Sequence, residues 1–109
     1  MPTHNVLVTV ENTDPQCFWL TSFLETAILR AVWYPTTVAT VSWHARQAIA
    51  GALAKSSENP AQVAFKLQDF GARGVSSQES AAIGGAAHLV NFQGSDTVSG
   101  ILYARKFYG

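Results

Sequence analysis

The amino-terminal part of the chain begins with a short β-branched run that gives way to a helix start. Residues 5–10 (NVLVTV) are rich in valine, which predicts a strand. Asp14 and Pro15 follow, and both are typical of a helix start. An aspartate accepts hydrogen bonds from free backbone N–H groups, and proline fits the first helical position because an N–H there has no partner anyway.

Two stretches of helical periodicity come next. Apolar side chains recur at helical spacing from Leu20 to Trp33 and again from Val38 to Leu53. Pro35 lies between the two stretches and predicts a break or kink, because proline removes a helical hydrogen bond. Residues 1–60 are therefore expected to form a strand followed by a helical hairpin.

The second half of the chain changes its period. Residues 62–69 (QVAFKLQD) alternate apolar and polar side chains, which predicts a strand. Ser76 and Glu79 have the spacing of a capping box, so a helix is expected from there to about Val90. The small residues 84–87 (GGAA) within this helix would let a neighbouring element pack closely.

The remaining elements complete a repeating order. A brief strand is expected at residues 90–92 and a helix from about 97 to 108. Strand, helix, strand and helix form a βαβα unit, so residues 61–109 are predicted to be parallel α/β structure. Two short strands make a poor sheet by themselves, and Gly109 directly follows a helix. We therefore expect an internal piece of a larger protein.

Composition narrows the class of protein. Seven basic and seven acidic residues give a formal net charge of zero, and the basic residues are scattered, so no nucleic-acid partner is expected. No run approaches the ~18 apolar residues of a membrane span, and no membrane partner is expected. Cys17 is the single cysteine, which rules out an internal disulfide and fits a reducing compartment. We expect a soluble, cytoplasmic protein.

The candidate chemistry lies after the two strands of the βαβα unit. Parallel α/β proteins place their ligand contacts at the carboxyl ends of strands. Phe70 offers an aromatic face there, Arg73 a guanidinium and Asp96 a carboxylate, which suggests a planar aromatic ligand with a polar substituent and an anionic partner. Three alternatives stay open: Phe70 as a core residue, Arg73 in a surface ion pair, and Asp96 as the cap of the last helix.

Other chemical motifs are weak. His4, His44 and His88 are far apart and have no metal-ligand spacing, so each is expected to be a surface or hydrogen-bonded histidine. Asp69, Phe70 and Gly71 match the magnesium-binding triplet of kinases by letters alone. The chain lacks the other kinase motifs, so that interpretation is rejected.

Four stretches in order resemble motifs of the nicotinamide phosphoribosyltransferases, which are type II phosphoribosyltransferases. They are VENTDP at residues 10–15, WYPTTVAT at 33–40, DFGARGVSSQE at 69–79, and AHLVNF with GSDTV at 87–98. The resemblance implies that residues 61–109 are the first βαβα unit of an irregular α/β barrel, and that residues 1–60 link it to a sheet domain. It also implies a homodimer with active sites at the subunit interface.

The resemblance further implies a reaction. Members of the family transfer phosphoribosyl from phosphoribosyl pyrophosphate to nicotinamide, giving nicotinamide mononucleotide and pyrophosphate in NAD biosynthesis. Mg²⁺ assists, and many members couple turnover to ATP through a phosphorylated histidine, which His88 does not match. No Mg²⁺ ligand is expected within this chain, and the chain by itself is expected to be inactive.

Three residues match binding positions of the family. By resemblance, Phe70 stacks on the pyridine ring opposite a tyrosine of the other subunit, Asp96 accepts from the carboxamide nitrogen, and Arg73 lies beside the phosphate-bearing substrate. Gln68 and Ala72 depart from the histidine and tyrosine that many relatives carry. Two alternative functions remain: a nicotinate phosphoribosyltransferase fragment, and a non-catalytic dimeric interaction module.

Overall fold

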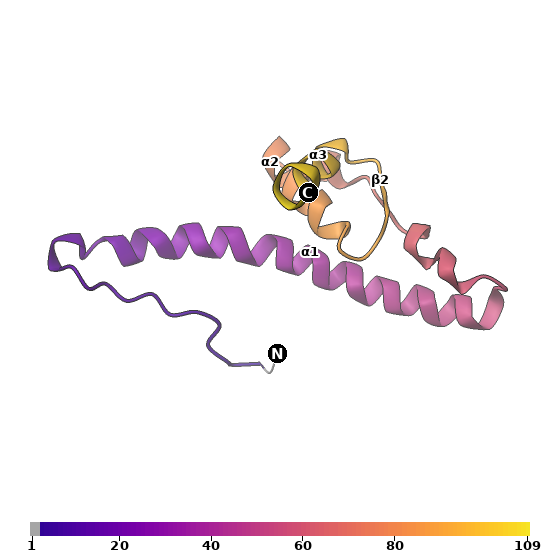
Figure 1. The fold of residues 1–109 in the computed structure, drawn as a ribbon, viewed down its shortest axis with the longest axis horizontal. Coiled ribbons are helices and arrows are strands. Elements are labelled where there is room, and N and C mark those ends of the chain that lie inside the picture. Colours follow the sequence, from indigo (N-terminus) through magenta and orange to yellow (C-terminus); the bar gives the residue numbers. More distant parts are fainter. Residues whose placement is uncertain (1–2) are drawn as a thin grey trace. The chain divides into compact units, whose positions relative to one another are not determined.

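The fold is known from a computed structural model that describes residues 3–109. The chain divides into two compact units, the first ending at Ala31 and the second comprising Val32–Gly109. Figure 1 shows one long helix and, later in the chain, two short helices with small strands. The fold is a mixed one, with helices and one parallel two-stranded sheet. The predicted division into residues 1–60 and 61–109 stays a prediction.

The first unit lacks the strand that was predicted at residues 5–10. Residues 5–10 form no strand, and Val6 and Leu7 are 76% and 68% exposed. The strand prediction was wrong because a strand needs a hydrogen-bonding partner, and the described residues offer none to this run. The predicted start at Asp14 and Pro15 is a 3₁₀ turn, Pro15–Cys17, in which Asp14 Oδ1 accepts from the Gln16 N–H at 2.9 Å.

Helix α1 is a single element, Leu20–Ser56, of 37 residues. Pro35 lies inside it, so the predicted helical hairpin was wrong. A proline removes one backbone donor, here the partner of the Ala31 carbonyl, and the helix continues on both sides of Pro35. The Thr37 hydroxyl also donates to the Trp33 carbonyl at 2.8 Å.

The strands are shorter than predicted. Strand β1 is Gln68–Asp69 and strand β2 is Gly94–Ser95. The two strands pair in parallel, as the βαβα prediction required. The first half of the strand predicted at residues 62–69 is instead part of a 3₁₀ helix, Pro60–Phe65, because Pro60 opens that turn. The strand predicted at 90–92 lies in a turn, and pairing begins two residues later.

The two short helices were predicted correctly, apart from a cap. Helix α2 is Gln78–His88 and helix α3 is Val98–Tyr108. The cap of α2 is Ser77, whose hydroxyl accepts from the Ser80 N–H at 3.0 Å. The capping box predicted at Ser76 was therefore one residue early, because two serines in a row carry the same signal.

Small residues let α2 and α3 approach closely. A Cβ added to Gly85 would lie 2.9 Å from the Gly100 Cα, and one added to Gly100 would lie 2.7 Å from the Gly85 backbone. A Cβ on Gly84 would meet the Tyr34 hydroxyl of α1 at 2.6 Å. The small-residue run of α2 thus packs against neighbours on two sides, as the sequence predicted.

The buried residues of the second unit are few and mixed in character. The apolar ones are Val63, Ala81, Ala82, Ala87 and Phe92, and the polar ones are Ser42, His88 and Thr97. Many large apolar side chains stay exposed. Ser42 and His88 are hydrogen-bonded to each other, whereas the buried Thr97 hydroxyl has no hydrogen-bond partner among the described residues. Within residues 3–109, no helix has both the length and the apolar character needed to cross a bilayer.

Candidate functional site

The parallel pairing brings two of the predicted site residues to one edge of the sheet. Asp69 ends β1 opposite Ser95, which ends β2. Phe70 follows the first strand and Asp96 follows the second, so both leave the same edge. The Asp96 N–H donates to the Asp69 carbonyl at 2.7 Å, which fixes the spacing of the two strand ends.

Asp69 also shapes the loop that carries Arg73. Its Oδ1 accepts from the Gly71 N–H at 2.9 Å, which turns the chain into the 3₁₀ helix Gly71–Gly74. Its Oδ2 lies beside Gly85 of α2, 3.3 Å from where a Cβ would stand. Sequence reasoning had set Asp69 aside with the kinase triplet. Its position as the last residue of a strand was the signal that it shapes the site.

The exposure of the candidates is compared within the described residues. Phe70 is 58% exposed there and does not belong to the core that residues 3–109 form. Asp96 is exposed, and the cap position of α3 belongs to Thr97, so Asp96 is not the helix cap. Arg73 is exposed in its 3₁₀ turn. The edge thus presents an aromatic ring and a carboxylate from adjacent strands, with a guanidinium on the connecting loop.

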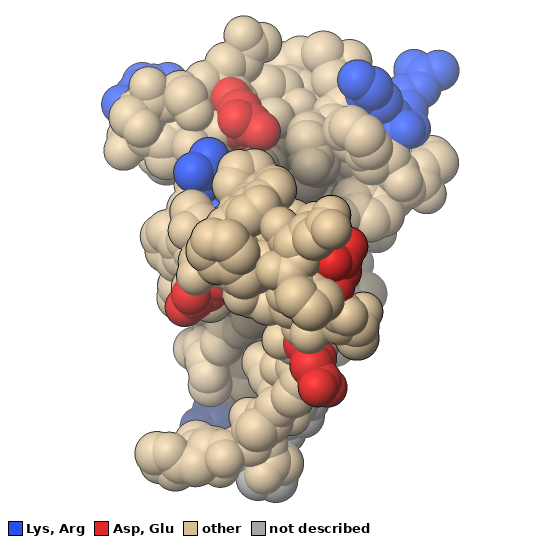
Figure 2. All heavy atoms as spheres, turned by 90° about the vertical axis from the view of Figure 1, so that its left-hand side faces the viewer, with Lys and Arg blue, Asp and Glu red and all other residues tan. Residues whose placement is uncertain are grey.

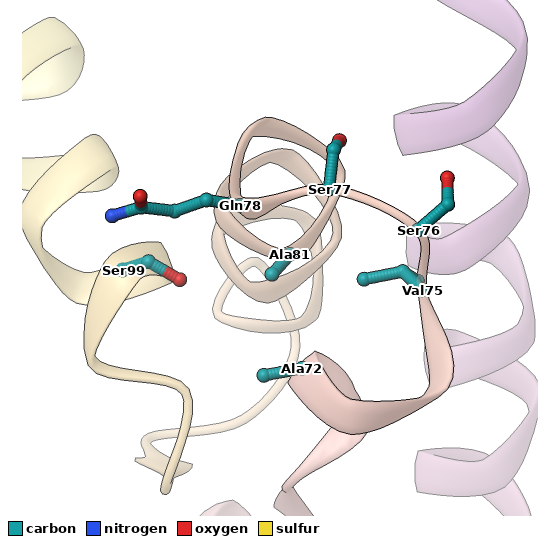
Figure 3. Close-up of a pocket in the computed structure, with 7 residues that line it drawn as sticks. All are labelled: Ala72, Val75, Ser76, Ser77, Gln78, Ala81 and Ser99. Carbon is teal, nitrogen blue, oxygen red and sulfur yellow. The ribbon is translucent and has the colours of Figure 1, made fainter.

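A hollow of about 450 Å³ lies beside this edge, at the start of α2. Figure 3 shows the chain passing from Ala72 through Val75 and Ser76 into the first turn of α2, with Ser99 of α3 on the other side. Phe70, Arg73 and Asp96 are not among its lining residues, which are Ala72, Val75, Ser76, Ser77, Gln78, Ala81 and Ser99. The candidate residues therefore lie on an open surface rather than in a closed pocket. This surface, made by Phe70, Arg73 and Asp96, is called the ring-binding wall below.

The two departures from the family pattern lie near this wall. Gln68 places its amide group against Gly94 of the paired strand and donates to the Phe65 carbonyl at 3.2 Å. Ala72 lines the hollow with a single methyl group. A larger side chain at residue 72 would reduce the volume of that hollow.

His88 is a buried polar residue close to the start of strand β1. Its Nδ1 lies 2.8 Å from the Ser42 hydroxyl of α1, and its Nε2 lies 3.2 Å from the Leu67 carbonyl, just before β1. The expectation of a hydrogen-bonded histidine is confirmed for His88. Sequence reasoning did not find its partners, because Ser42 is 46 residues away along the chain.

The described residues offer no place for the Mg²⁺ that the resemblance implies. No group of three or more His, Cys, Asp or Glu side chains within residues 3–109 could hold a metal ion. On the face drawn in Figure 2, basic and acidic side chains lie in separate small groups among uncharged residues.

Comparison with known proteins shows which proteins the chain is similar to. A family model described as "Nicotinate phosphoribosyltransferase (NAPRTase) family" matches residues 65–108. A nicotinamide phosphoribosyltransferase of Xanthomonas campestris pv. campestris is 61% identical over 99% of this chain and 23% of its own length. One of Acinetobacter baylyi is 33% identical over 94% of the chain and 20% of its own length. One of Mycoplasma pneumoniae is 33% identical over 92% of the chain and 23% of its own length.

The resemblance to the nicotinamide phosphoribosyltransferases is confirmed. The chain spans about a quarter or less of the length of these curated relatives. The family match over residues 65–108 contains both strands and the whole of helices α2 and α3. All three candidate residues fall within residues 65–108, the range that the family model matches.

Proposed function

We propose that the whole protein transfers phosphoribosyl from phosphoribosyl pyrophosphate to the ring nitrogen of nicotinamide, giving nicotinamide mononucleotide and pyrophosphate. The proposal depends on one observation above the others. Phe70 and Asp96 leave adjacent parallel strands at the same edge, joined by the hydrogen bond from Asp96 N–H to the Asp69 carbonyl at 2.7 Å. A flat ring with an amide substituent needs these two groups side by side.

Phe70 provides the flat surface. Its ring is 58% exposed, so a pyridine ring can stack on it without a rearrangement of the neighbouring residues. Offset stacking of aromatic rings adds roughly 0.5–1.5 kcal/mol beyond the buried area. In the proposal, the second face of the ligand is covered by the partner subunit's tyrosine that the family resemblance implies.

Asp96 provides the polar contact. An ionised carboxylate accepts hydrogen bonds and donates none, so it suits the NH₂ group of a carboxamide. The same carboxylate repels the negative charge of nicotinate, which makes Asp96 a specificity residue. Its backbone N–H donates to the Asp69 carbonyl, so the backbone from which the carboxylate projects lies beside the end of β1.

Arg73 provides the contact to phosphate. A guanidinium offers a planar set of donors that matches phosphate oxygens. In the reaction, the lone pair of the pyridine nitrogen forms a bond to C1 of the ribose, and pyrophosphate leaves with the electrons of the broken C–O bond. The residues of this chain bind and orient the ring and one anionic group.

The remaining parts of the active site belong to the proposal through the resemblance alone. They are Mg²⁺, coupling to ATP in the manner of many relatives, and a homodimer whose subunits share each site. We also propose a cytoplasmic location, which fits the single cysteine, Cys17. The barrel of which the βαβα unit would form the first part is proposed on the same basis.

Nicotinate is the second candidate substrate, and the family description itself favours it, because that description names nicotinate. The exposed carboxylate of Asp96 argues for nicotinamide instead. The test is a mononucleotide assay on the full-length protein with phosphoribosyl pyrophosphate and either nicotinamide or nicotinate. We expect a higher kcat/KM with nicotinamide. A preference for nicotinate would support the sister activity, and absence of both products would favour the non-catalytic module.

A further inference from the structure

We infer that His88 is a positioning residue for the ring-binding wall, acting on Phe70 through Leu67 and strand β1. The inference rests on the proposed function, because it names what holds the nicotinamide contacts in place. His88 is 6% exposed and does not lie at the strand edge, so it acts without touching the substrate. Its burial also separates it from the role of a phosphorylated histidine.

The strands need such an anchor because they are very short. Each has two residues, and the ladder contains the pairs Gln68 with Gly94 and Asp69 with Ser95. So few backbone bonds hold a strand weakly. Contacts made by neighbouring side chains must therefore decide where the strand ends lie.

His88 contacts the approach to β1 directly. Its Nε2 lies 3.2 Å from the carbonyl oxygen of Leu67, the residue immediately before the strand and three before Phe70. A carbonyl oxygen accepts and never donates, so Nε2 must carry the hydrogen. The bond fixes the backbone direction with which the chain enters β1.

Ser42 sets the orientation of the imidazole. Its hydroxyl lies 2.8 Å from His88 Nδ1, and the serine is 5% exposed on α1. In the neutral ring with hydrogen on Nε2, Nδ1 is an acceptor and the Ser42 hydroxyl donates to it. Both ring nitrogens are thereby satisfied in one tautomer, which points the Nε2 hydrogen at Leu67.

The same ring also contacts the approach to β2. It stacks on Phe92 with centroids 5.0 Å apart and an angle of 10° between the planes. Phe92 is 1% exposed and lies two residues before β2. The adjacent Asn91 is fixed to α1, since its side chain donates to the Ala39 carbonyl at 2.9 Å and its carbonyl accepts from Arg46. His88 thus links the entries of both strands to α1.

The test compares three variants of the full-length protein. His88→Phe keeps a ring to stack on Phe92 but loses both hydrogen bonds, and we expect it to raise the KM for nicotinamide about tenfold. His88→Gln keeps an amide donor that can reach Leu67, and it should stay within about threefold of wild type. Ser42→Ala removes the orienting hydroxyl alone and should fall between them.

Rescue by glutamine separates positioning from a general loss of packing, because glutamine supplies the donor without the ring. An unchanged KM in both His88→Phe and Ser42→Ala would overturn the inference. Equal losses in His88→Gln and His88→Phe would also overturn it. If His88→Phe does not fold, the Ser42→Ala and His88→Gln pair gives the same decision.

Two measurements without substrate separate this inference from the proposed function. The ¹⁵N spectrum of histidine-labelled protein should show His88 with hydrogen on Nε2. Amide hydrogen exchange of residues 68–71 should be faster in Ser42→Ala than in wild type. A hydrogen on Nδ1, or unchanged exchange, would contradict the inference even in an active enzyme. An inactive wild-type enzyme with both expected results would contradict the proposed function instead, and the contact of His88 with β1 would stand.

Discussion

The ring of Phe70 is 58% exposed, although phenylalanine is among the residues most often buried in proteins. Nearby Phe65 is 60% exposed, so exposure alone does not distinguish the two. Their surroundings do, because Phe70 leaves a strand end beside Asp96 whereas Phe65 ends a 3₁₀ helix. These two residues therefore offer a matched pair for mutation.

We expect Phe70→Ala in the full-length enzyme to raise the KM for nicotinamide about tenfold or more. The variant loses the stacking surface, and each ~1.4 kcal/mol of binding corresponds to a factor of ten. Steady-state kinetics would measure the effect. Phe65→Ala, which removes an equally exposed ring, should leave that KM within about twofold. Equal effects of the two variants would show that Phe70 does not face the ligand.

Asp96 is expected to set the choice between amide and acid. Asp96→Asn should lower kcat/KM for nicotinamide and raise it for nicotinate, changing their ratio by about tenfold, because the repelling charge is gone. The ratio is measured with both substrates at one pH. Glu58→Gln removes another exposed carboxylate of the same unit and serves as the control. A ratio that stays constant in Asp96→Asn would remove Asp96 from the substrate site.

At the scale of elements, two adjacent serines at the start of α2 have different contacts, although the sequence gives both of them the same capping signal. Ser77 accepts from the Ser80 N–H at 3.0 Å, whereas Ser76 is exposed beside the hollow. Ser77→Ala should lower the free energy of unfolding by about 0.5–2 kcal/mol, since a helix cap is lost. Ser76→Ala should change it by less than about 0.5 kcal/mol. Urea denaturation of both variants checks the assignment, and the reverse order would restore the predicted capping box.

The crossing of α2 and α3 depends on Gly85 and Gly100. A Cβ on Gly85 would stand 2.9 Å from the Gly100 backbone, so one of the helices would have to move. We expect Gly85→Ala to destabilise the protein by about 1–3 kcal/mol.

The control for that crossing is a glycine of α1 with open space around it. Gly51 has no neighbour within 4 Å of an added Cβ. Gly51→Ala should therefore be neutral or should stabilise the protein by up to about 1 kcal/mol, because alanine favours a helix. Thermal unfolding of both variants measures the difference. Equal melting temperatures for Gly85→Ala and wild type would contradict the close approach of the two helices.

At the scale of the whole molecule, exposed apolar side chains are numerous in both units. They include Val6 at 76%, Trp19 at 53%, Trp33 at 57% and Phe107 at 56% exposed. Proteins that stay monomeric rarely leave so many large apolar groups in water. Such surfaces associate with one another when nothing else covers them.

We therefore expect the 109-residue chain by itself to self-associate and to form no nicotinamide mononucleotide. It contributes one wall of a site, and transfer also needs groups that stabilise the charge developing on pyrophosphate. Sedimentation would measure the association, and a product assay with phosphoribosyl pyrophosphate would measure the activity. A monomer that turns over nicotinamide would contradict both expectations.

The sequence by itself determined the two short helices and the resemblance to nicotinamide phosphoribosyltransferases. Helical spacing and caps predicted α2 and α3, because those signals depend on residues a few positions apart. The motifs at residues 69–79 and 87–98 carried the resemblance, and that resemblance held over 99% of the chain. The sequence also selected Phe70 and Asp96, since residues that follow parallel strands meet at one edge.

The tertiary structure decided what depends on partners far along the chain. Residues 5–10 have a strand composition but no neighbouring strand among residues 3–109, so they form no strand in the structure. Helix α1 continues through Pro35 because the loss of one donor does not outweigh the bonds on either side. The contacts of His88 with Ser42 and Leu67 join positions 46 and 21 residues away, a distance that no local pattern encodes. Packing in three dimensions alone brings those groups together, because hydrogen bonds depend on distance in space rather than on separation along the chain.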